Sequence, residues 1–317
     1  MQRSATDPFA SCDTPICCPR PTLLPLRCPT ISNIQTRSLS RRKWTRFAQV
    51  ALGCVAVGFA TWAFWIEPAS LRNQGYDVTL QRWPAECDGL RIAVLADLHV
   101  GSPYNGLDAL EEVIDLTEQA EVDLVLLAGD FVIHGVVGGT FVAPEASAKV
   151  IGRLSAPAFA VLGNHDWWLD AKRVRSALEQ QGIPVFEDSA QELVIASCRF
   201  WLAGVSDLWE GPHNIEAALA PIPATAPTIL FTHNPDLFPR VPDRVAITFA
   251  GHTHGGQVYL PGIGRPIVPS DFGERYAIGH IVENDKHLFV SSGIGTSIIP
   301  VRFLVPPEIS VIRLNAP

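Results

Sequence analysis

Residues 91–99 read Arg-Ile-Ala-Val-Leu-Ala-Asp-Leu-His, an apolar run that ends in two polar residues, Asp97 and His99. An apolar run of this length predicts a buried strand, and residues two apart in an extended segment point to the same side. Ligands of α/β sheets collect beyond the carboxyl ends of the strands. Asp97 and His99 are therefore placed to bind one cation together.

Four further segments repeat this arrangement of polar residues after a β-like apolar run. They are Gly129-Asp130, Gly163-Asn164-His165-Asp166, His233-Asn234 and Gly251-His252-Thr253-His254-Gly255-Gly256. One such segment alone is an ordinary turn or surface group, but five strand ends with complementary donor types predict one shared metal site. The histidines outside the segments are interpreted as ordinary core or surface groups: His134, His213, His280 and His287.

The residue types in these segments suit a pair of metal ions. The Asp130 carboxylate offers several lone pairs, which allows it to bridge two cations. The amide oxygen of Asn164 is a neutral ligand, His165 is a natural proton donor, and Asp166 is expected to orient it. Imidazole, carboxylate and amide donors suit Mn, Fe or Zn better than Ca.

The five segments together resemble the calcineurin-like metallophosphoesterase family, whose pattern is D-x-H, G-D, G-N-H-[DE], a lone H and G-H-x-H. The resemblance extends from Asp97 to His254. It implies an α/β fold, a four-layer αββα sandwich of two mixed β-sheets with the site at their loop edge. It also implies two divalent metal ions and hydrolysis of a phosphoester bond by a metal-activated hydroxide.

The resemblance also implies a role for each residue of the site. One metal ion would be held by Asp97, His99, Asp130 and His254, and the other by Asp130, Asn164, His233 and His252. The non-ligand acid at the leaving oxygen would be His165, assisted by Asp166. More narrowly, residues 163–168 and 251–257 are similar to the membrane-anchored or exported bacterial YaeI/YkuE-like branch.

The chain from Tyr76 onward alternates strand and helix patterns, which predicts a single catalytic domain over residues 76–317. Strands are expected at Arg91–Ala96, Leu124–Ala128, Ala158–Leu162, Ile229–Thr232, Ala246–Ala250, Gln257–Leu260, Ala277–Val282, Leu288–Val290 and Ile309–Leu314. Helices are expected at Leu107–Ala120, Pro144–Leu154 and Trp168–Gln181. The first half predicts parallel strands with right-handed crossovers, and the second half a mixed or antiparallel sheet.

An apolar stretch at residues 47–66 precedes this domain and is long enough for a helix to span the roughly 30 Å of a bilayer core. The basic cluster at residues 41–46 keeps the N-terminus cytoplasmic by the positive-inside rule and places the domain outside the inner membrane. We expect a single-pass, uncleaved signal anchor, with Trp62 and Trp65 in the membrane interface. A twin-arginine export signal, suggested by residues 40–44, and a buried core helix are the alternatives.

The charge and the cysteines differ between the two ends of the chain. Residues 1–46 carry a net charge of +6 and are expected to form a disordered basic tail, whereas the remainder carries −14. The acidic domain argues against a nucleic acid held by bulk electrostatics. Cys87 and Cys198 could form a disulfide if the domain is extracytoplasmic, but we interpret them as two independent buried thiols.

Three hypotheses for function follow. The first is a membrane-anchored two-metal phosphoesterase that hydrolyses a phosphodiester or pyrophosphate, with a lipid or envelope component as substrate because the anchor confines the site to a membrane surface. The second is an envelope-binding scaffold protein with incidental catalysis. The third is a phosphomonoesterase or phosphoprotein phosphatase of the same superfamily, for which no dedicated arginine pair is apparent. Four aromatic residues are expected beside the site or in the core: Trp167, Trp168, Phe272 and Tyr276.

Overall fold

Two β-sheets form the centre of the molecule in the computed structural model, which describes residues 35–317. Sheet 1 has the strand order β1-β11-β2-β3-β4, and sheet 2 has the order β5-β6-β7-β8-β10-β9. The strands of sheet 1 are β1 Arg72–Thr79, β2 Leu90–Leu95, β3 Leu124–Ala128, β4 Ala158–Val161 and β11 Glu308–Asn315. Those of sheet 2 are β5 Ser189–Ile195, β6 Cys198–Val205, β7 Thr228–Thr232, β8 Ile247–Ala250, β9 Gly279–Glu283 and β10 Lys286–Val290.

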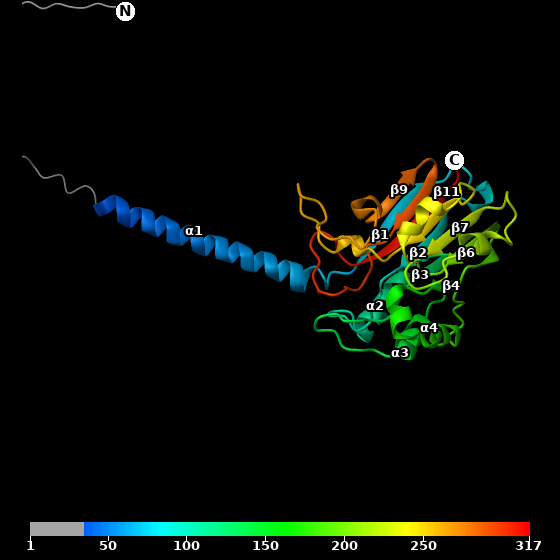
Figure 1. Cartoon of the computed structure of the whole chain (residues 1–317), viewed down its shortest axis with the longest axis horizontal. Helices are drawn as coiled ribbons and strands as arrows, with labels where there is room; N and C mark the ends of the chain where they lie inside the picture. Colours follow the sequence, from blue (N-terminus) through cyan, green and yellow to red (C-terminus); the bar gives the residue numbers. More distant parts are fainter. Residues whose placement is uncertain (1–34) are drawn as a thin grey trace, which may run out of the picture. The chain divides into compact units, whose positions relative to one another are not determined.

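The two sheets pack face to face through a core to which both contribute, including Ile92 and Leu126 of sheet 1 and Phe231 and Phe249 of sheet 2. The helices that cover the outer face of sheet 1 are α2 Leu107–Gln119, α3 Pro144–Ile151 and α4 Asn164–Glu179 (Figure 1). Those that pack on the outer face of sheet 2 are α5 Ile215–Leu219 and the 3-10 helix η3 Pro235–Arg240. This αββα layering confirms the predicted fold class.

The predicted strands that carry the polar segments are present. β2, β3 and β4 run parallel, and so do β7 and β8. The predicted strand at Gln257–Leu260 is wrong, because this segment makes only isolated bridges, one of them between Val258 and Phe303. The helix expected from Trp168 begins earlier, at Asn164.

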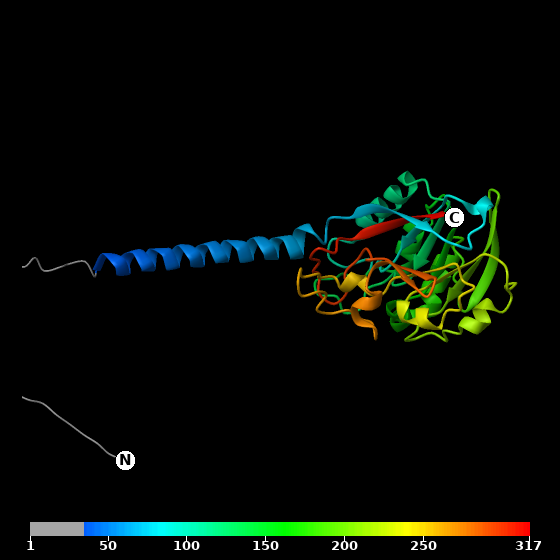
Figure 2. The ribbon, with the colours of Figure 1, turned by 90° about the horizontal axis from the view of Figure 1, so that it is seen from above.

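Three strands and one short helix were not predicted: β1, β5, β6 and α5. β1 lies at the edge of sheet 1, and Val78 is its one buried residue, so no apolar alternation marks it. Its partner is β11, which inserts between β1 and β2 and runs parallel to the first and antiparallel to the second. Figure 2 shows β11 in red beside β1 in cyan.

An N-terminal helix, α1, spans Gln35–Thr61 and continues as a π-helical turn, η1 Trp62–Ile66. It begins before Phe47, so residues 35–46, which were predicted to be disordered, are helical; they contain no Pro or Gly to interrupt a helix that the apolar run propagates. The tail predicted over residues 1–34 lies outside the described residues. Arg41–Ile66 is long and apolar enough to cross a membrane, and from Cys54 onward the chain belongs to the folded domain.

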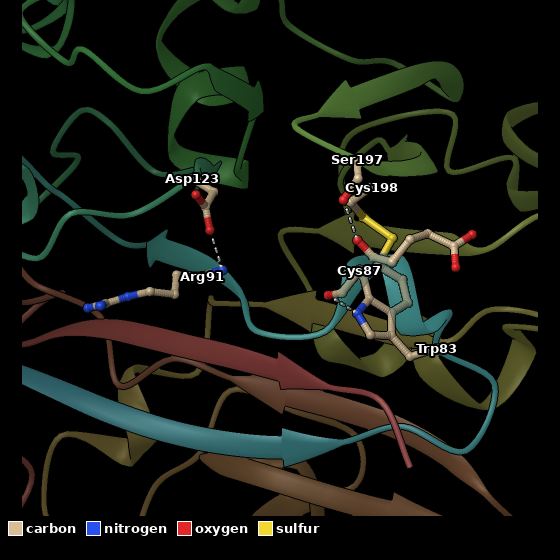
Figure 3. Close-up of a disulfide and its surroundings, with 7 residues drawn as sticks. Trp83, Cys87, Arg91, Asp123, Ser197 and Cys198 are labelled. Atoms are coloured by element: carbon tan, nitrogen blue, oxygen red, sulfur yellow. Dashed lines mark hydrogen bonds between the residues drawn. A yellow bond between two sulfur atoms is a disulfide. The ribbon is translucent and has the colours of Figure 1, made fainter.

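A disulfide joins Cys87 and Cys198, whose Cα atoms are 4.4 Å apart (Figure 3). The interpretation of these residues as independent thiols is wrong. The short helix η2, Ala85–Cys87, holds Cys87 against the first residue of β6, because the Trp83 indole donates to the Cys87 carbonyl at 2.8 Å and the Ser197 hydroxyl donates to the Glu86 carbonyl at 3.1 Å. The bond ties the segment before β2 of sheet 1 to sheet 2 across 111 residues of sequence.

Replacing both Cys87 and Cys198 with serine is expected to lower the free energy of unfolding by about 2–5 kcal/mol, because opening the loop releases conformational freedom in the unfolded chain. Denaturant unfolding of the full chain in detergent measures this difference. The matched control is Cys54→Ser, since Cys54 is a free, exposed cysteine. Equal unfolding free energies for the wild type and the double variant would contradict the expectation.

Candidate metal centre

The seven predicted ligands all follow strands at the same loop edge of the two sheets, and all seven are buried. Sheet 1 contributes Asp97 and His99 after β2, Asp130 after β3 and Asn164 after β4. Sheet 2 contributes His233 after β7, and His252 and His254 after β8. The structure therefore brings together residues that are spread over more than half of the domain's sequence.

Asp97, His99 and His254 form the first group of donor atoms. The Nε2 atoms of His99 and His254 are 3.1 Å apart, and Nε2 of His254 lies 3.5 Å from Oδ1 of Asp97. Nε2 of His99 is also 3.5 Å from Oδ2 of Asp130. The donor atoms of these four residues therefore converge, and they are too close together for another side chain to lie between them.

Asn164, His233 and His252 form the second group. Oδ1 of Asn164 lies 3.2 Å from Nε2 of His233 and 3.1 Å from Nδ1 of His252, and the two imidazole nitrogens are 3.1 Å apart. Nε2 of His233 lies 3.4 Å from Oδ2 of Asp130. A single oxygen atom of Asp130 therefore belongs to both groups.

The spacing of these donor atoms fits metal ions. Donors that bind one ion at about 2.0–2.2 Å in a tetrahedral shell lie roughly 3.3–3.6 Å apart, close to the 3.1–3.5 Å separations within each group. In addition, Nδ1 of His99 lies 3.0 Å from the Val132 carbonyl oxygen, and Nδ1 of His233 lies 2.7 Å from the Ala128 carbonyl oxygen. Donation to these carbonyls leaves both Nε2 lone pairs free for ligation.

The electrostatics of the cluster also favour cations. Burial raises the pKa of Asp97 to about 7 and lowers the pKa of His99 to about 4. Although burial opposes its charge, the neighbouring Asp130 raises the pKa of His233 to about 10, and His233 holds the pKa of Asp130 well below its usual range against the effect of burial. Because only a neutral imidazole ligates, a cation that binds here displaces the His233 proton, and its affinity increases with pH.

The backbone of the ligand loops is turned sharply after β2, β3 and β8. Five of the seven candidate ligands have positive φ, namely Asp97 at 52°, His99 at 38°, Asp130 at 57°, His252 at 70° and His254 at 51°. Such conformations cost of order 1–3 kcal/mol each and persist where the surroundings enforce them. Gly163 permits the closest approach, since a Cβ atom there would lie 2.3 Å from Oδ1 of Asp130.

Asp166 has a different position from the one predicted. Nδ1 of His165 has no hydrogen-bond partner among the described residues, so Asp166 does not orient this ring. The Asp166 carboxylate instead accepts hydrogen bonds of 2.9–3.3 Å from four backbone N–H groups, those of Asp130, Phe131, Val132 and Gly163. Asp166 therefore holds the loop that presents Asp130 to both donor groups.

His165 lies at the edge of the two groups. Its backbone N–H donates to Oδ1 of Asp130 at 2.9 Å, and its ring centroid is 4.6 Å from that of His99. Burial lowers the pKa of His165, so the ring is neutral near pH 7 and retains one N–H donor. A ring nitrogen of His165 lies within 4.8 Å of donor atoms of His99 and Asp130, close enough to reach an oxygen bound between them.

A cavity of about 430 Å³ opens over the donor groups. Its polar lining comes from Asp130, Asn164, His165, His252 and His254 among others. The apolar lining includes Trp168, Trp209, Ile267, Ile298, Ile299 and Val301. Among the described residues that line it there is no Lys or Arg.

Comparison with known proteins explains this combination of fold and site. A family model described as calcineurin-like phosphoesterase matches residues 90–256, which include all seven donor residues. The chain belongs to the calcineurin-like phosphoesterase family. It is a metal-dependent phosphoesterase with a divalent metal centre, as the sequence pattern predicted.

Curated relatives of this calcineurin-like phosphoesterase include bacterial and animal proteins. An uncharacterized metallophosphoesterase, YkuE of Bacillus subtilis, is 29% identical over 88% of this chain and 99% of its own length. Phosphodiesterase YaeI of Escherichia coli is 31% identical over 71% of this chain and 82% of its own. A transmembrane protein with metallophosphoesterase domain from Danio rerio is 26% identical over 75% of this chain and 56% of its own.

Several residues that line the cavity of this phosphoesterase were not predicted as part of the site, His134 and Trp209 among them. His134 was interpreted as an ordinary histidine, but it lines the cavity with its ring 5.6 Å from that of Trp168. The ring of Trp209 lies 4.3 Å from that of His252. Both residues lie in loops without a local motif, so no signal in the sequence marks them. Of the aromatic residues expected beside the site or in the core, Trp168 lines the cavity and Tyr276 is buried in the core.

Replacing Asp166 with asparagine is expected to lower the free energy of unfolding by about 1–3 kcal/mol, because an amide has one acceptor oxygen and leaves buried backbone N–H groups unpaired. Bound metal per chain is expected to fall as well, since the Asp130 loop loses its support. Asp115→Asn, an exposed change on α2, is the control. A loss confined to kcat, with stability and metal content unchanged, would instead restore the predicted role in orienting His165.

Proposed function

We propose that this chain is a membrane-anchored phosphoesterase that hydrolyses phosphodiester or pyrophosphate bonds in a lipid or envelope component. The observation that carries the proposal is the single oxygen, Oδ2 of Asp130, that lies 3.5 Å from Nε2 of His99 and 3.4 Å from Nε2 of His233. One carboxylate oxygen shared by two donor groups is the arrangement that a two-metal site requires.

Two divalent cations, Mn, Fe or Zn, suit the imidazole, carboxylate and amide donors, and when bound they supply Lewis acidity and a metal-activated hydroxide near neutral pH. We assign Asp97, His99, Asp130 and His254 to one ion, and Asp130, Asn164, His233 and His252 to the other. The chain's own contribution is to hold these seven side chains rigidly, through strand ends and buried backbone contacts, in a site that opens to substrate through one cavity.

His165 is the residue we assign to the leaving group. Its ring lines the cavity, and burial lowers its pKa, so at neutral pH it donates a hydrogen bond from a neutral N–H. Directed at the leaving oxygen, this N–H donates a hydrogen bond that stabilises the negative charge developing there.

The lining of the cavity favours a diester over a monoester. A phosphomonoester dianion is usually bound with the help of arginine or lysine side chains, and the described lining contains neither. A diester or pyrophosphate carries a substituent on both sides of the scissile bond, and the apolar walls formed by Ile267, Ile298 and Trp168 offer it a surface. The name of the relative YaeI, a phosphodiesterase, agrees with this choice.

We place the protein in the inner membrane with its N-terminus cytoplasmic and its domain outside. The basic residues before the apolar helix support this orientation, and so does the Cys87–Cys198 disulfide, since such bonds persist in oxidising compartments. Contacts between the end of the helix and the catalytic domain favour an uncleaved anchor over an export signal that is removed. Ala63 accepts a hydrogen bond from the Arg302 N–H at 2.9 Å, and the buried Glu67 accepts one from the Val305 N–H at 2.6 Å.

Asp130→Ala is expected to abolish turnover of bis(p-nitrophenyl) phosphate and to remove bound metal, with an effect larger than the roughly 10- to 100-fold that follows loss of an outer hydrogen-bond partner. His252→Ala, at the second donor group, should behave alike, whereas His280→Ala on exposed β9 should not. Turnover is measured for metal-replete full chain in detergent, beside a screen of monoesters, nucleotide sugars and phospholipids. Wild-type turnover in Asp130→Ala would rule out the two-metal proposal.

His165→Ala is expected to lower kcat by roughly 100- to 1,000-fold, the range for loss of one hydrogen-bond donor to a developing oxyanion, while metal content stays close to that of the wild type. Metal analysis and turnover of bis(p-nitrophenyl) phosphate, measured on the same preparation, separate the two effects. Loss of metal from this variant would make His165 a ligand instead.

A further inference from the structure

Three loops beside the metal cavity carry exposed apolar side chains and few charges. They are residues 131–143 between β3 and α3, 257–270 after β8 and 296–305 before β11. None of the three contains an Asp or Glu, although the chain after residue 46 carries a net charge of −14. Ile263 and Ile267 are each 77% exposed, and Ile298 is 66% exposed.

The three loops form one continuous surface. Tyr259 N–H donates to the Phe303 carbonyl at 2.8 Å, and Phe303 N–H donates to the Gln257 carbonyl at 2.9 Å, which joins the second loop to the third. Val137 N–H donates to the Ile298 carbonyl at 2.9 Å, which joins the first to the third. We call this surface the apolar rim. Exposed apolar surfaces of this kind mark contacts with another molecule or with a membrane.

The charged residues within two of these loops do not break the apolar character of the rim. Arg302 is fully buried, and its guanidinium donates to backbone carbonyls, among them those of Ser292, Val305 and Gly295. Arg265 lies over the ring of Tyr259, 5.1 Å from its centroid. The rim therefore presents mainly hydrocarbon side chains and one cation, Arg265, whose backbone N–H donates to the neighbouring Glu274 carboxylate at 2.9 Å. The three loops themselves contain no carboxylate that an anionic membrane would repel.

The end of the apolar helix packs directly on the third loop. The ring of Phe59 lies 4.3 Å from that of Phe303, and the Ala63 carbonyl accepts from the Arg302 N–H. Phe59 precedes Trp62, which is expected in the membrane interface, by three residues, about 4.5 Å along a helix axis. If the helix spans the bilayer with Trp62 in the interface, Phe303 lies near the boundary of headgroups and acyl chains. Figures 1 and 2 show the second and third loops on the side of the domain where this helix ends.

The rim is also the wall of the metal cavity. Ile267, Ile298, Ile299 and Val301 line it together with Asp130 and His252 of the donor groups. We propose that the apolar rim inserts into the membrane–water interface on the outer face of the inner membrane, so that the metal cavity opens onto the bilayer. The cavity then receives a phosphodiester or pyrophosphate whose hydrocarbon chain stays against these side chains. This substrate class rests on the proposed phosphoesterase function, whereas the membrane contact itself does not.

The membrane contact is tested by a photo-crosslinking side chain, p-benzoyl-phenylalanine, placed at Ile263 or at Leu304. Both positions are exposed and lie outside the cavity lining. The control position is Val194, which is 56% exposed on β5, pairs with Arg199 near the start of β6, and so lies at the end of sheet 2 opposite the ligand loops. The full chain is reconstituted in vesicles of phosphatidylcholine and phosphatidylglycerol and irradiated.

Lipid adducts, found by mass spectrometry, are expected at positions 263 and 304 and not at 194. Equal lipid labelling at all three positions overturns the proposal, and so do adducts between two copies of the chain in place of lipid at 263 and 304. Bound metal equal to that of the wild type shows that each labelled chain is folded. Because two loops are labelled separately, failure of one variant to fold leaves the other as the test.

The substrate class is tested with two diesters that share one scissile bond, hexadecyl p-nitrophenyl phosphate in the same vesicles and ethyl p-nitrophenyl phosphate in solution. Ile263→Asp combined with Leu304→Asp is expected to lower kcat/KM for the hexadecyl diester by about tenfold or more, because aspartate removes apolar burial at the interface. Turnover of the ethyl diester is expected to stay unchanged, and Val194→Asp is expected to change neither.

Equal effects of the double variant on both diesters, or no effect on either, overturn the lipid substrate while the phosphoesterase function stands. Hydrolysis of neither diester by the wild type overturns the proposed function, and in that case the crosslinking result still decides the membrane contact.

Discussion

The structure depends on one constraint, the meeting of two donor groups at Oδ2 of Asp130. Sheet 1 supplies four of the seven ligands and sheet 2 the other three, so the shared atom fixes how far apart the carboxyl ends of the two sheets lie. Asp166 secures the loop of Asp130 by accepting hydrogen bonds from consecutive backbone N–H groups. The close-packed hydrophobic core between the sheets therefore fixes the position of one sheet relative to the other. It does so to within the distance that separates two donor atoms around one metal ion.

Burial of this polar cluster is costly, and several features offset the cost. Two carboxylates and four imidazoles lie almost without solvent contact, and five of the ligands have positive φ. The Asp130–His233 pair provides charge neutralisation within the protein itself, and bound cations provide it more strongly. A site of this kind is stable because the surrounding strands enforce it, which is also why its geometry is already formed for ligation.

Much of the site could be predicted from the sequence because each ligand lies in a short polar segment directly after an apolar run, which is a local signal. Asp166 shows the limit of such reasoning. It adjoins His165 in sequence, but its carboxylate is taken by backbone groups of residues 130–132, a long-range contact that no local pattern reveals. The Cys87–Cys198 bond was considered but not preferred, because a pairing across 111 residues also has no local pattern. β1 was missed because an exposed edge strand with one buried residue has no apolar period. β6, by contrast, is apolar enough to have been found.

The placement of β11 has a consequence for the order in which the domain is assembled during synthesis. This strand is made after all the ligand loops, yet it lies inside sheet 1 and is the hydrogen-bonded neighbour of both β1 and β2. Until residues 308–315 are available, β1 has no partner, and the strand that carries Asp97 and His99 has one free edge. Long-range pairing of this type is slow. Before β11 is made, a nascent chain therefore exposes an edge of β2, a template for edge-to-edge aggregation, and the loop of Asp97 and His99 follows a strand that is supported on one side only.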